Sequence, residues 1–143
     1  MTPTDTSGFR TVGFIGLGAM GSRMVRHLKG QARLLIADTD EARARAAAAD
    51  VGGDVADGPA VLADADAVVL MLPTSAIVDQ VLHGDGQGNE GLLAHLKPGA
   101  FVIDMSSSAP THTVANAEAA AAKGIRFIDA PVSGGIKGAE AVS

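Results

Sequence analysis

The chain has 143 residues, contains no cysteine, tryptophan or tyrosine, and has four phenylalanines as its only large aromatic side chains. Without cysteine it can form no disulfide, bind no metal through thiolates and use no cysteine nucleophile. Because 47% of the residues are nevertheless hydrophobic, the core is expected to consist of aliphatic side chains. The length is sufficient for one domain with a core of its own.

Basic clusters and long apolar runs are also missing. The net charge is -5, and no segment gathers the lysines and arginines with which a protein follows nucleic-acid phosphates. No run approaches the roughly 18 apolar residues of a membrane span, and the start, MTPTDTSGFR, lacks the profile of a signal peptide. We therefore expect a cytoplasmic domain at residues 10–143, preceded by a flexible tail at 1–9, with neither nucleic acid nor membrane as a partner.

Short apolar runs alternate with stretches of helical spacing along the whole chain. Because parallel neighbouring strands need crossover connections, this alternation predicts an α/β fold with a doubly wound parallel sheet. The expected strand order is 3-2-1-4-5-6, with ligands bound at the carboxyl ends, near the switch between strands 1 and 4. The six expected strands lie at about residues 11–16, 34–37, 51–55, 67–72, 101–103 and 126–129.

The first strand and the first helix are joined by glycines with GxGxxG spacing. In a dinucleotide site, the first glycine allows a tight turn, the second lets a pyrophosphate approach the backbone, and the third lets helix and strand pack closely. The amides at the start of the helix then face the diphosphate. A ligand-free turn is the alternative, although such a turn needs one glycine rather than three. The predicted cofactor-binding residues here are Gly16, Leu17, Gly18, Ala19, Met20 and Gly21.

Asp38 ends the second expected strand, 38 - 21 = 17 positions after the last of these glycines, which is typical of dinucleotide sites. Two roles are open for its carboxylate. With Glu41 three residues later, Asp38 could cap the next helix. It could also accept bonds from the adenosine ribose hydroxyls and repel a 2′-phosphate. Since no Arg or Lys follows at positions 39 or 40, the sequence favours NAD over NADP.

Three further strand ends should lie at the same edge of the sheet as the glycines. Leu72 and Pro73 follow the fourth strand, Ser106 and Ser107 follow the fifth, and the triplet Ser133, Gly134 and Gly135 follows the sixth. A hydroxyl beside exposed backbone amides suits a carboxylate or another anion, although an ordinary turn is the alternative for each loop. The pattern predicts a Rossmann-type dinucleotide-binding domain with a substrate site at Ser106 and at residues 133–135.

The chain resembles the β-hydroxyacid dehydrogenases, the group of 3-hydroxyisobutyrate dehydrogenase and tartronate semialdehyde reductase. The resemblance rests on four stretches, GFIGLGAMGSRM, MLPTS, FVIDMSSSAP and FIDAPVSGG. It implies that residues 12–38 surround the adenine half of the cofactor and that Leu72, Pro73 and Ser107 contact the cofactor. It also implies that residues 133–135 bind the carboxylate of a small hydroxyacid.

In that family a lysine donates and accepts the proton, and a helical second domain closes the site and forms the dimer. The resemblance places both beyond Ser143, and Lys137 matches no catalytic motif, so we expect no catalytic residue in this chain and little or no activity from it alone. The prediction is an NAD-dependent 3-hydroxyacid dehydrogenase. Related reductases of tartronate semialdehyde, other semialdehydes or imines, and an NAD-binding sensor without catalysis, are the alternatives. The four histidines show no metal-ligand spacing, and the GxSxG motif of serine hydrolases is missing.

Overall fold

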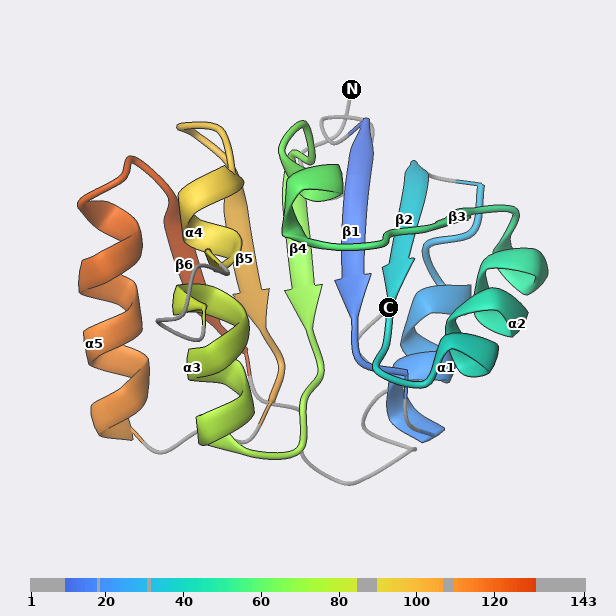
Figure 1. Ribbon diagram of the computed structural model, residues 1–143, viewed down its shortest axis with the longest axis horizontal. Coiled ribbons are helices and arrows are strands. Elements are labelled where there is room, and N and C mark those ends of the chain that lie inside the picture. The colour runs from blue at the N-terminus through green and yellow to red at the C-terminus, as the bar shows by residue number, and fades with distance from the viewer. Residues whose placement is uncertain (1–9, 18, 31, 85–89, 107–109, 131–143) are drawn as a thin grey trace.

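A computed structural model describes residues 10–17, 19–30, 32–84, 90–106 and 110–130 of the chain. They form a six-stranded sheet in the order β3-β2-β1-β4-β5-β6, and every pair of neighbouring strands is parallel (Figure 1). The predicted fold class and strand order are therefore confirmed. The strands are β1 (Thr11–Ile15), β2 (Arg33–Ala37), β3 (Asp54–Val55), β4 (Ala67–Leu70), β5 (Phe101–Asp104) and β6 (Arg126–Asp129).

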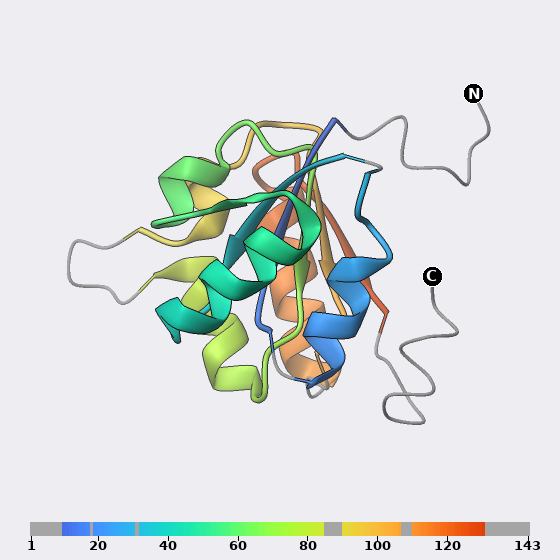
Figure 2. The same cartoon turned by 90° about the vertical axis from the view of Figure 1, so that its right-hand side faces the viewer.

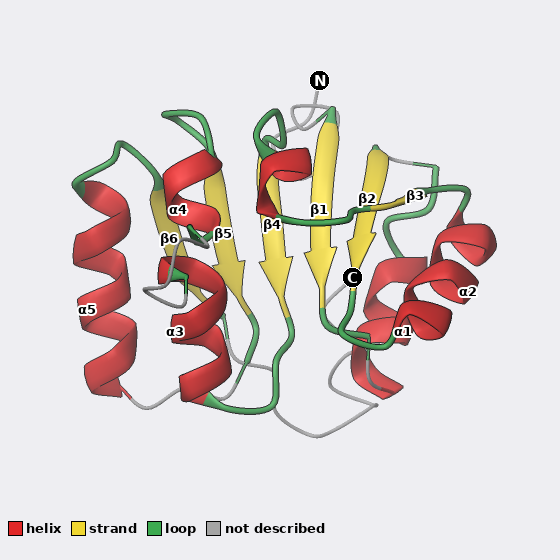
Figure 3. Cartoon of the chain, viewed as in Figure 1, coloured by secondary structure: helices red, strands yellow, loops and turns green. Residues whose placement is uncertain are grey.

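Helical segments connect the strands and surround the sheet (Figures 2 and 3). Val51, expected to begin the third strand, instead ends a helix, because Gly52 adopts a left-handed conformation and terminates it there. A short helix that the sequence analysis did not predict precedes β5. The helical segments are α1 (Ala19–Arg26), α2 (Glu41–Val51), the 3-10 turn η2 (Pro59–Leu62), α3 (Ser75–His83), α4 (Leu92–His95) and α5 (Pro110–Ala121).

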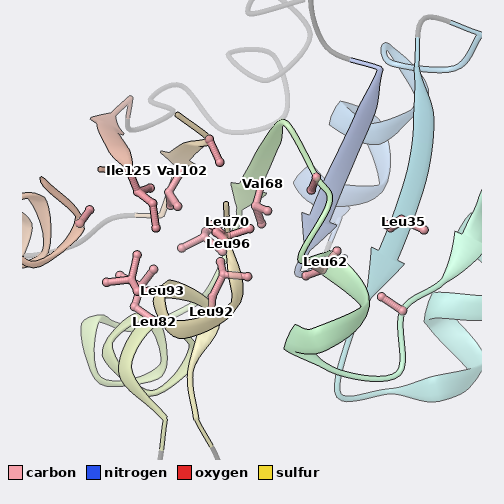
Figure 4. Close-up of a cluster of buried hydrophobic side chains, with 14 of the residues drawn as sticks. Leu35, Leu62, Val68, Leu70, Leu82, Leu92, Leu93, Leu96, Val102 and Ile125 are labelled. Atoms are coloured by element: carbon pink, nitrogen blue, oxygen red, sulfur yellow. The ribbon is translucent and has the colours of Figure 1, made fainter. Parts of the chain in front are cut away.

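Two clusters of buried apolar side chains form the core, because successive residues of a strand point to opposite faces of the sheet. The central strand β4 reads AVVL and is buried at all four positions, as expected for a strand covered on both faces. One cluster brings the sheet together with α1 and α2, and its members include Phe14, Val25, Ile36, Ala44 and Ala48. The other lies against η2, α3, α4 and α5 (Figure 4), and its members include Leu62, Val68, Leu82, Leu92, Val102 and Ile125.

Because all neighbouring strands are parallel, the carboxyl ends of all six lie at one edge of the sheet, toward which the arrowheads of β1, β2, β4 and β5 point in Figure 1. β1 and β4 lie side by side at the switch in strand order, with Ile15 opposite Leu70 at their carboxyl ends. The loops that follow these two strands are therefore neighbours. Among the described residues, none of the helices has both the length and the apolar character needed to cross a bilayer.

Candidate cofactor site

The turn after β1 is built around Gly16, which has a φ of +100° and donates its N–H to the Ala37 carbonyl at 3.0 Å. A Cβ at this position would lie 2.2 Å from the Met71 carbonyl oxygen. The chain leaving β1 thus passes directly against the end of β4, and only glycine fits both the conformation and the space.

Gly21 lies in α1, over this turn. A Cβ there would lie 2.2 Å from the carbonyl oxygen of Gly16, so the lack of a side chain lets α1 approach the strand end closely. The Ser22 hydroxyl donates to the Leu17 carbonyl at 2.9 Å and ties α1 to the same turn. The turn and α1 therefore meet with the close packing that the glycine pattern predicts. Gly18 lies outside the described residues, as do the side chains of Ala19 and Met20.

The Asp38 carboxylate, which follows β2, lies against the turn. Its Oδ2 accepts a hydrogen bond from the Leu17 amide at 2.7 Å, its Oδ1 accepts one from the Asp40 amide at 2.8 Å, and the side chain is only 7% exposed. The cap of α2 is Asp40, whose Oδ1 accepts from the Arg43 amide at 3.2 Å. The suggestion that Asp38 caps this helix is therefore wrong.

Ser106 links the loop after β5 to the loop after β4. Its hydroxyl accepts a hydrogen bond from the Leu72 amide at 2.7 Å, and the residue is 3% exposed. The Ser106 amide in turn donates to Asp104 Oδ1 at 2.9 Å, and Asp104 is completely buried. Leu72 reaches the glycine turn, because its Cδ2 would lie 3.2 Å from a Cβ at Gly16. The two loops and the turn thus form one connected unit.

The part that Asp104 plays in this unit was not predicted from the sequence. A carboxylate in an otherwise apolar strand end, FVID, was the signal that could have identified it, since a buried charge needs hydrogen-bond partners. Ser106 was expected to bind substrate, and its hydroxyl is engaged by the Leu72 amide; the substrate role stays a prediction. Pro73 follows at an exposed position. The remaining predicted residues, Ser107, Ser133, Gly134 and Gly135, lie outside the described residues.

A separate polar cluster joins α3 to α5, away from the strand ends. His83 Nε2 lies 2.8 Å from Asn116 Oδ1, and the Asn116 amide group donates to Asp79 Oδ1 at 3.0 Å. Asn116 is 2% exposed, and its two bonds satisfy the polar ends of its side chain where two helices meet. In the described part of the chain no three histidine, aspartate or glutamate side chains gather as metal ligands.

The glycine turn, the start of α1 and the Asp38 carboxylate fit a dinucleotide. Backbone without Cβ atoms lets diphosphate oxygens approach, and the amino end of a helix favours their negative charge. Asp38 stands next to this turn, where a ribose would follow the phosphates. The edge that carries these groups is the one at which open parallel sheets bind ligands.

Comparisons with known proteins agree with this geometry. The sequence pattern of the NAD binding domain of 6-phosphogluconate dehydrogenase matches residues 11–143. The chain is 42% identical over 131 residues to 2-(hydroxymethyl)glutarate dehydrogenase of Eubacterium barkeri, a match that covers 91% of this chain and 42% of that enzyme. It is 38% identical over 132 residues to 3-hydroxyisobutyrate dehydrogenase of Pseudomonas aeruginosa, with 91% of this chain and 43% of that enzyme covered.

Solved structures show the same relationship. A Mycobacterium tuberculosis 3-hydroxyisobutyrate dehydrogenase with L-serine matches with a TM-score of 0.79 and 34% identity over 94% of this chain and 44% of that one. Psf3 in complex with NADP+ and 2-OPP matches with a TM-score of 0.78 and 31% identity, over 88% and 44% of the two chains.

The chain spans less than half the length of these relatives. They include hydroxyacid dehydrogenases, as the resemblance in the sequence implied, and they confirm that resemblance. The match over residues 11–143 places the chain in the family defined by the NAD binding domain of 6-phosphogluconate dehydrogenase.

Proposed function

We propose that the chain is the coenzyme-binding part of an NAD-dependent oxidoreductase of the 3-hydroxyisobutyrate dehydrogenase type. The observation that carries the proposal is the contact between Asp38 Oδ2 and the Leu17 amide at 2.7 Å. It puts a carboxylate for the ribose hydroxyls beside a glycine turn suited to a diphosphate. The dehydrogenases among the relatives support the same reaction class.

In this proposal, different residues of the chain bind different parts of the cofactor and the substrate. The backbone of residues 16–21 receives the diphosphate, Asp38 holds the adenosine ribose, and Leu72 and Pro73 lie along the cofactor with Ser107. Residues 133–135 hold the carboxylate of the substrate. When bound, the nicotinamide supplies the hydride acceptor for the carbon that bears the substrate hydroxyl. By holding both molecules in one orientation, the chain contributes proximity rather than proton transfer.

Proton transfer is assigned to a lysine outside residues 1–143, in the helical second domain that the family resemblance implies. Residues 10–143 form the dinucleotide-binding domain in this proposal, and the complete enzyme is a homo-oligomer. The chain alone is then expected to bind coenzyme and to oxidise substrate slowly or not at all.

Calorimetric titration with NAD+ tests the cofactor site. Asp38→Asn removes the charge while keeping the shape of the side chain, and we expect it to weaken NAD+ binding about tenfold, since a hydrogen bond to a charged group contributes about 1.5 kcal/mol or more. Asp50→Asn is the matched control, because Asp50 is half-exposed on α2 and pairs with Arg26 at the surface. It should leave affinity within about twofold. Folded wild-type protein that binds neither NAD+ nor NADP+ would refute the proposal.

A second titration separates an enzyme from a sensor. 3-Hydroxyisobutyrate added to NAD+-saturated protein should bind and tighten NAD+ binding if residues 133–135 receive a carboxylate next to the nicotinamide. An NAD-binding sensor would show no second, coupled ligand, and that result would favour the sensor over the dehydrogenase.

A further inference from the structure

Asn116 lies between α3 and α5, where it is 2% exposed and contacts two polar side chains of α3. Its Nδ2 donates to Asp79 Oδ1 at 3.0 Å, and its Oδ1 lies 2.8 Å from His83 Nε2. Asp79 and His83 are one turn apart on α3 and therefore share a face of that helix. These three residues form the α3–α5 polar cluster.

Asp79 determines the directions of the hydrogen bonds in the α3–α5 polar cluster. Because an ionised carboxylate only accepts, the Asn116 side chain presents its NH2 group to Asp79 and its carbonyl oxygen to His83. His83 Nε2 therefore carries a hydrogen and donates it. A displacement of α3 along α5 would break both contacts together, so the α3–α5 polar cluster selects one position of the two helices.

Stability does not explain a buried polar side chain at this position. The buried residues next to it on both helices, Val78, Leu82 and Ala120, are apolar. A buried hydrogen bond contributes little net stability, and apolar side chains of the same shape in place of both partners are about as stable or more so. The best-attested use of a buried asparagine between helices is to fix their register. The position of the helices, rather than their stability, therefore accounts for Asn116.

A second contact joins the same two parts of the chain at the carboxyl edge of the sheet. The Leu72 amide donates to Ser106 Oγ at 2.7 Å, and these two residues precede α3 and α5 in the chain. Figure 1 shows both helices on one face of the sheet, each beginning at the carboxyl edge. One contact alone would let α3 pivot about it, whereas two contacts at different heights also fix the tilt of the helix. The α3–α5 polar cluster is the second of these contacts.

We propose that Asn116 is a positioning residue for the coenzyme site. Through its two contacts it holds α3 in the register that coenzyme binding needs, and α3 in turn holds the loop at Leu72 and Pro73. This inference rests on the proposed cofactor site, in which that loop lies along the cofactor. Asn116 lies away from the strand ends and acts only through α3.

The main test is the double variant His83→Leu with Asn116→Leu, which makes both sides of the helix contact apolar. Asp79 is only partly buried, so water replaces its lost partner, and the urea midpoint should equal or exceed that of wild type. NAD+ affinity, measured by calorimetry on the same sample, should nevertheless fall about fivefold, as for a substitution that acts on a ligand site without touching the ligand. A purely structural contact would leave the affinity unchanged when stability is unchanged.

Hydrogen exchange at the Leu72 amide measures the position of the loop without coenzyme. This amide is bonded to Ser106 and should exchange faster in the double variant, while the amides of β4 keep their wild-type rates. His83→Gln supplies an N–H donor at a similar reach and should keep both the wild-type exchange rate and the wild-type affinity. Asp50→Asn is the matched control, because it removes an exposed contact between two other helices, α1 and α2, and should change neither quantity.

The outcomes separate this inference from the proposed function. If wild type binds neither NAD+ nor NADP+, the proposed cofactor site is wrong. If wild type binds NAD+ and the double variant keeps the wild-type affinity and Leu72 exchange rate, the cofactor site stands and the positioning role of Asn116 is overturned. If stability and affinity fall together in the double variant, Asn116 is an ordinary structural contact, and the positioning role is likewise overturned.

Discussion

Asp38 at the carboxyl edge of the sheet and Asp66 at its amino edge hold the backbone in the same way. Each carboxylate accepts two backbone N–H groups, at distances between 2.7 and 3.0 Å. Asp66 binds the amides of Arg10 and Thr11, where the chain enters β1, just as Asp38 binds an amide where the chain leaves it. Both ends of β1 are thus held by an aspartate from another part of the chain.

The two aspartates differ in where their cation lies. Lys97 Nζ is 2.6 Å from Asp66 Oδ1, in direct contact, whereas Arg43 stays 3.9 Å from Asp38. At the amino edge Asp66 and Lys97 form a direct ion pair, which stabilises the fold. At the carboxyl edge the Arg43 guanidinium stays beyond hydrogen-bonding distance of Asp38, so the carboxylate is held by backbone amides alone. This comparison predicts that substitutions at the amino edge change stability and substitutions at the carboxyl edge also change coenzyme affinity.

The largest difference in stability is expected between alanine substitutions at two glycines with positive φ. Gly16 lies at the carboxyl edge and Gly99 at the amino edge. Gly99 has a φ of +90° with nothing within 4 Å of a Cβ, while a Cβ at Gly16 would lie 2.2 Å from Met71 O. We expect Gly16→Ala to lower the free energy of unfolding by about 3 kcal/mol or more, from strain and overpacking together. Gly99→Ala should lower it by about 1 kcal/mol, from backbone strain alone.

Urea denaturation of both variants measures this difference. If both variants lost the same free energy of unfolding, the turn after β1 would be able to move away from β4 at little energetic cost. The close packing at the carboxyl edge would then not be required for the fold.

At the amino edge, Asp66→Asn should produce the next largest loss in the free energy of unfolding. The substitution removes the charge that two backbone amides and Lys97 share, and hydrogen bonds to charged groups contribute about 1.5–3 kcal/mol each. Because the Asp66 side chain is 22% exposed and asparagine still accepts one bond, we expect a loss of about 2 kcal/mol in urea denaturation. NAD+ affinity should stay within about twofold of wild type. A fall in affinity as large as that caused by Asp38→Asn would contradict the division between the two edges.

Ser106→Ala should have a smaller effect on stability and a measurable one on binding. It leaves the Leu72 amide without its buried acceptor, which costs about 1 kcal/mol or somewhat more. Since Leu72 contacts the glycine turn, loosening it should weaken NAD+ binding a fewfold. Calorimetry and urea denaturation on the same sample separate the two effects. Unchanged NAD+ affinity, together with lost binding of 3-hydroxyisobutyrate, would return Ser106 to the substrate role that the sequence suggested.

Strand order and the position of the glycine turn followed from the sequence, because apolar runs and glycine spacing are local signals. The hydrogen-bond partners within the site could not be predicted from the sequence. Asp38 is held at Leu17 because the turn after β1 lies against the end of β2, where Gly16 donates to the Ala37 carbonyl. Asp40, two residues later, caps α2. Ser106 faces the Leu72 amide because two loops far apart in the sequence meet. The four residues of α4 are too few to show a helical period.

The smallest predicted effect concerns the pH dependence of the amino edge. The hydrogen bond from Lys97 holds the pKa of Asp66 below its ordinary value of 3.8; burial opposes this, and the amides of Thr11 and Arg10 lower it further. A carboxylate whose pKa is lower in the folded state stabilises the fold above its unfolded pKa and loses this contribution as the pH falls through the folded pKa. The stability difference between wild type and Asp66→Asn should therefore be constant from neutral pH to about pH 5 and shrink toward about pH 3. Urea midpoints at stepped pH measure it, and a difference that stays constant or grows in acid would show that the Asp66 charge does not stabilise the amino edge.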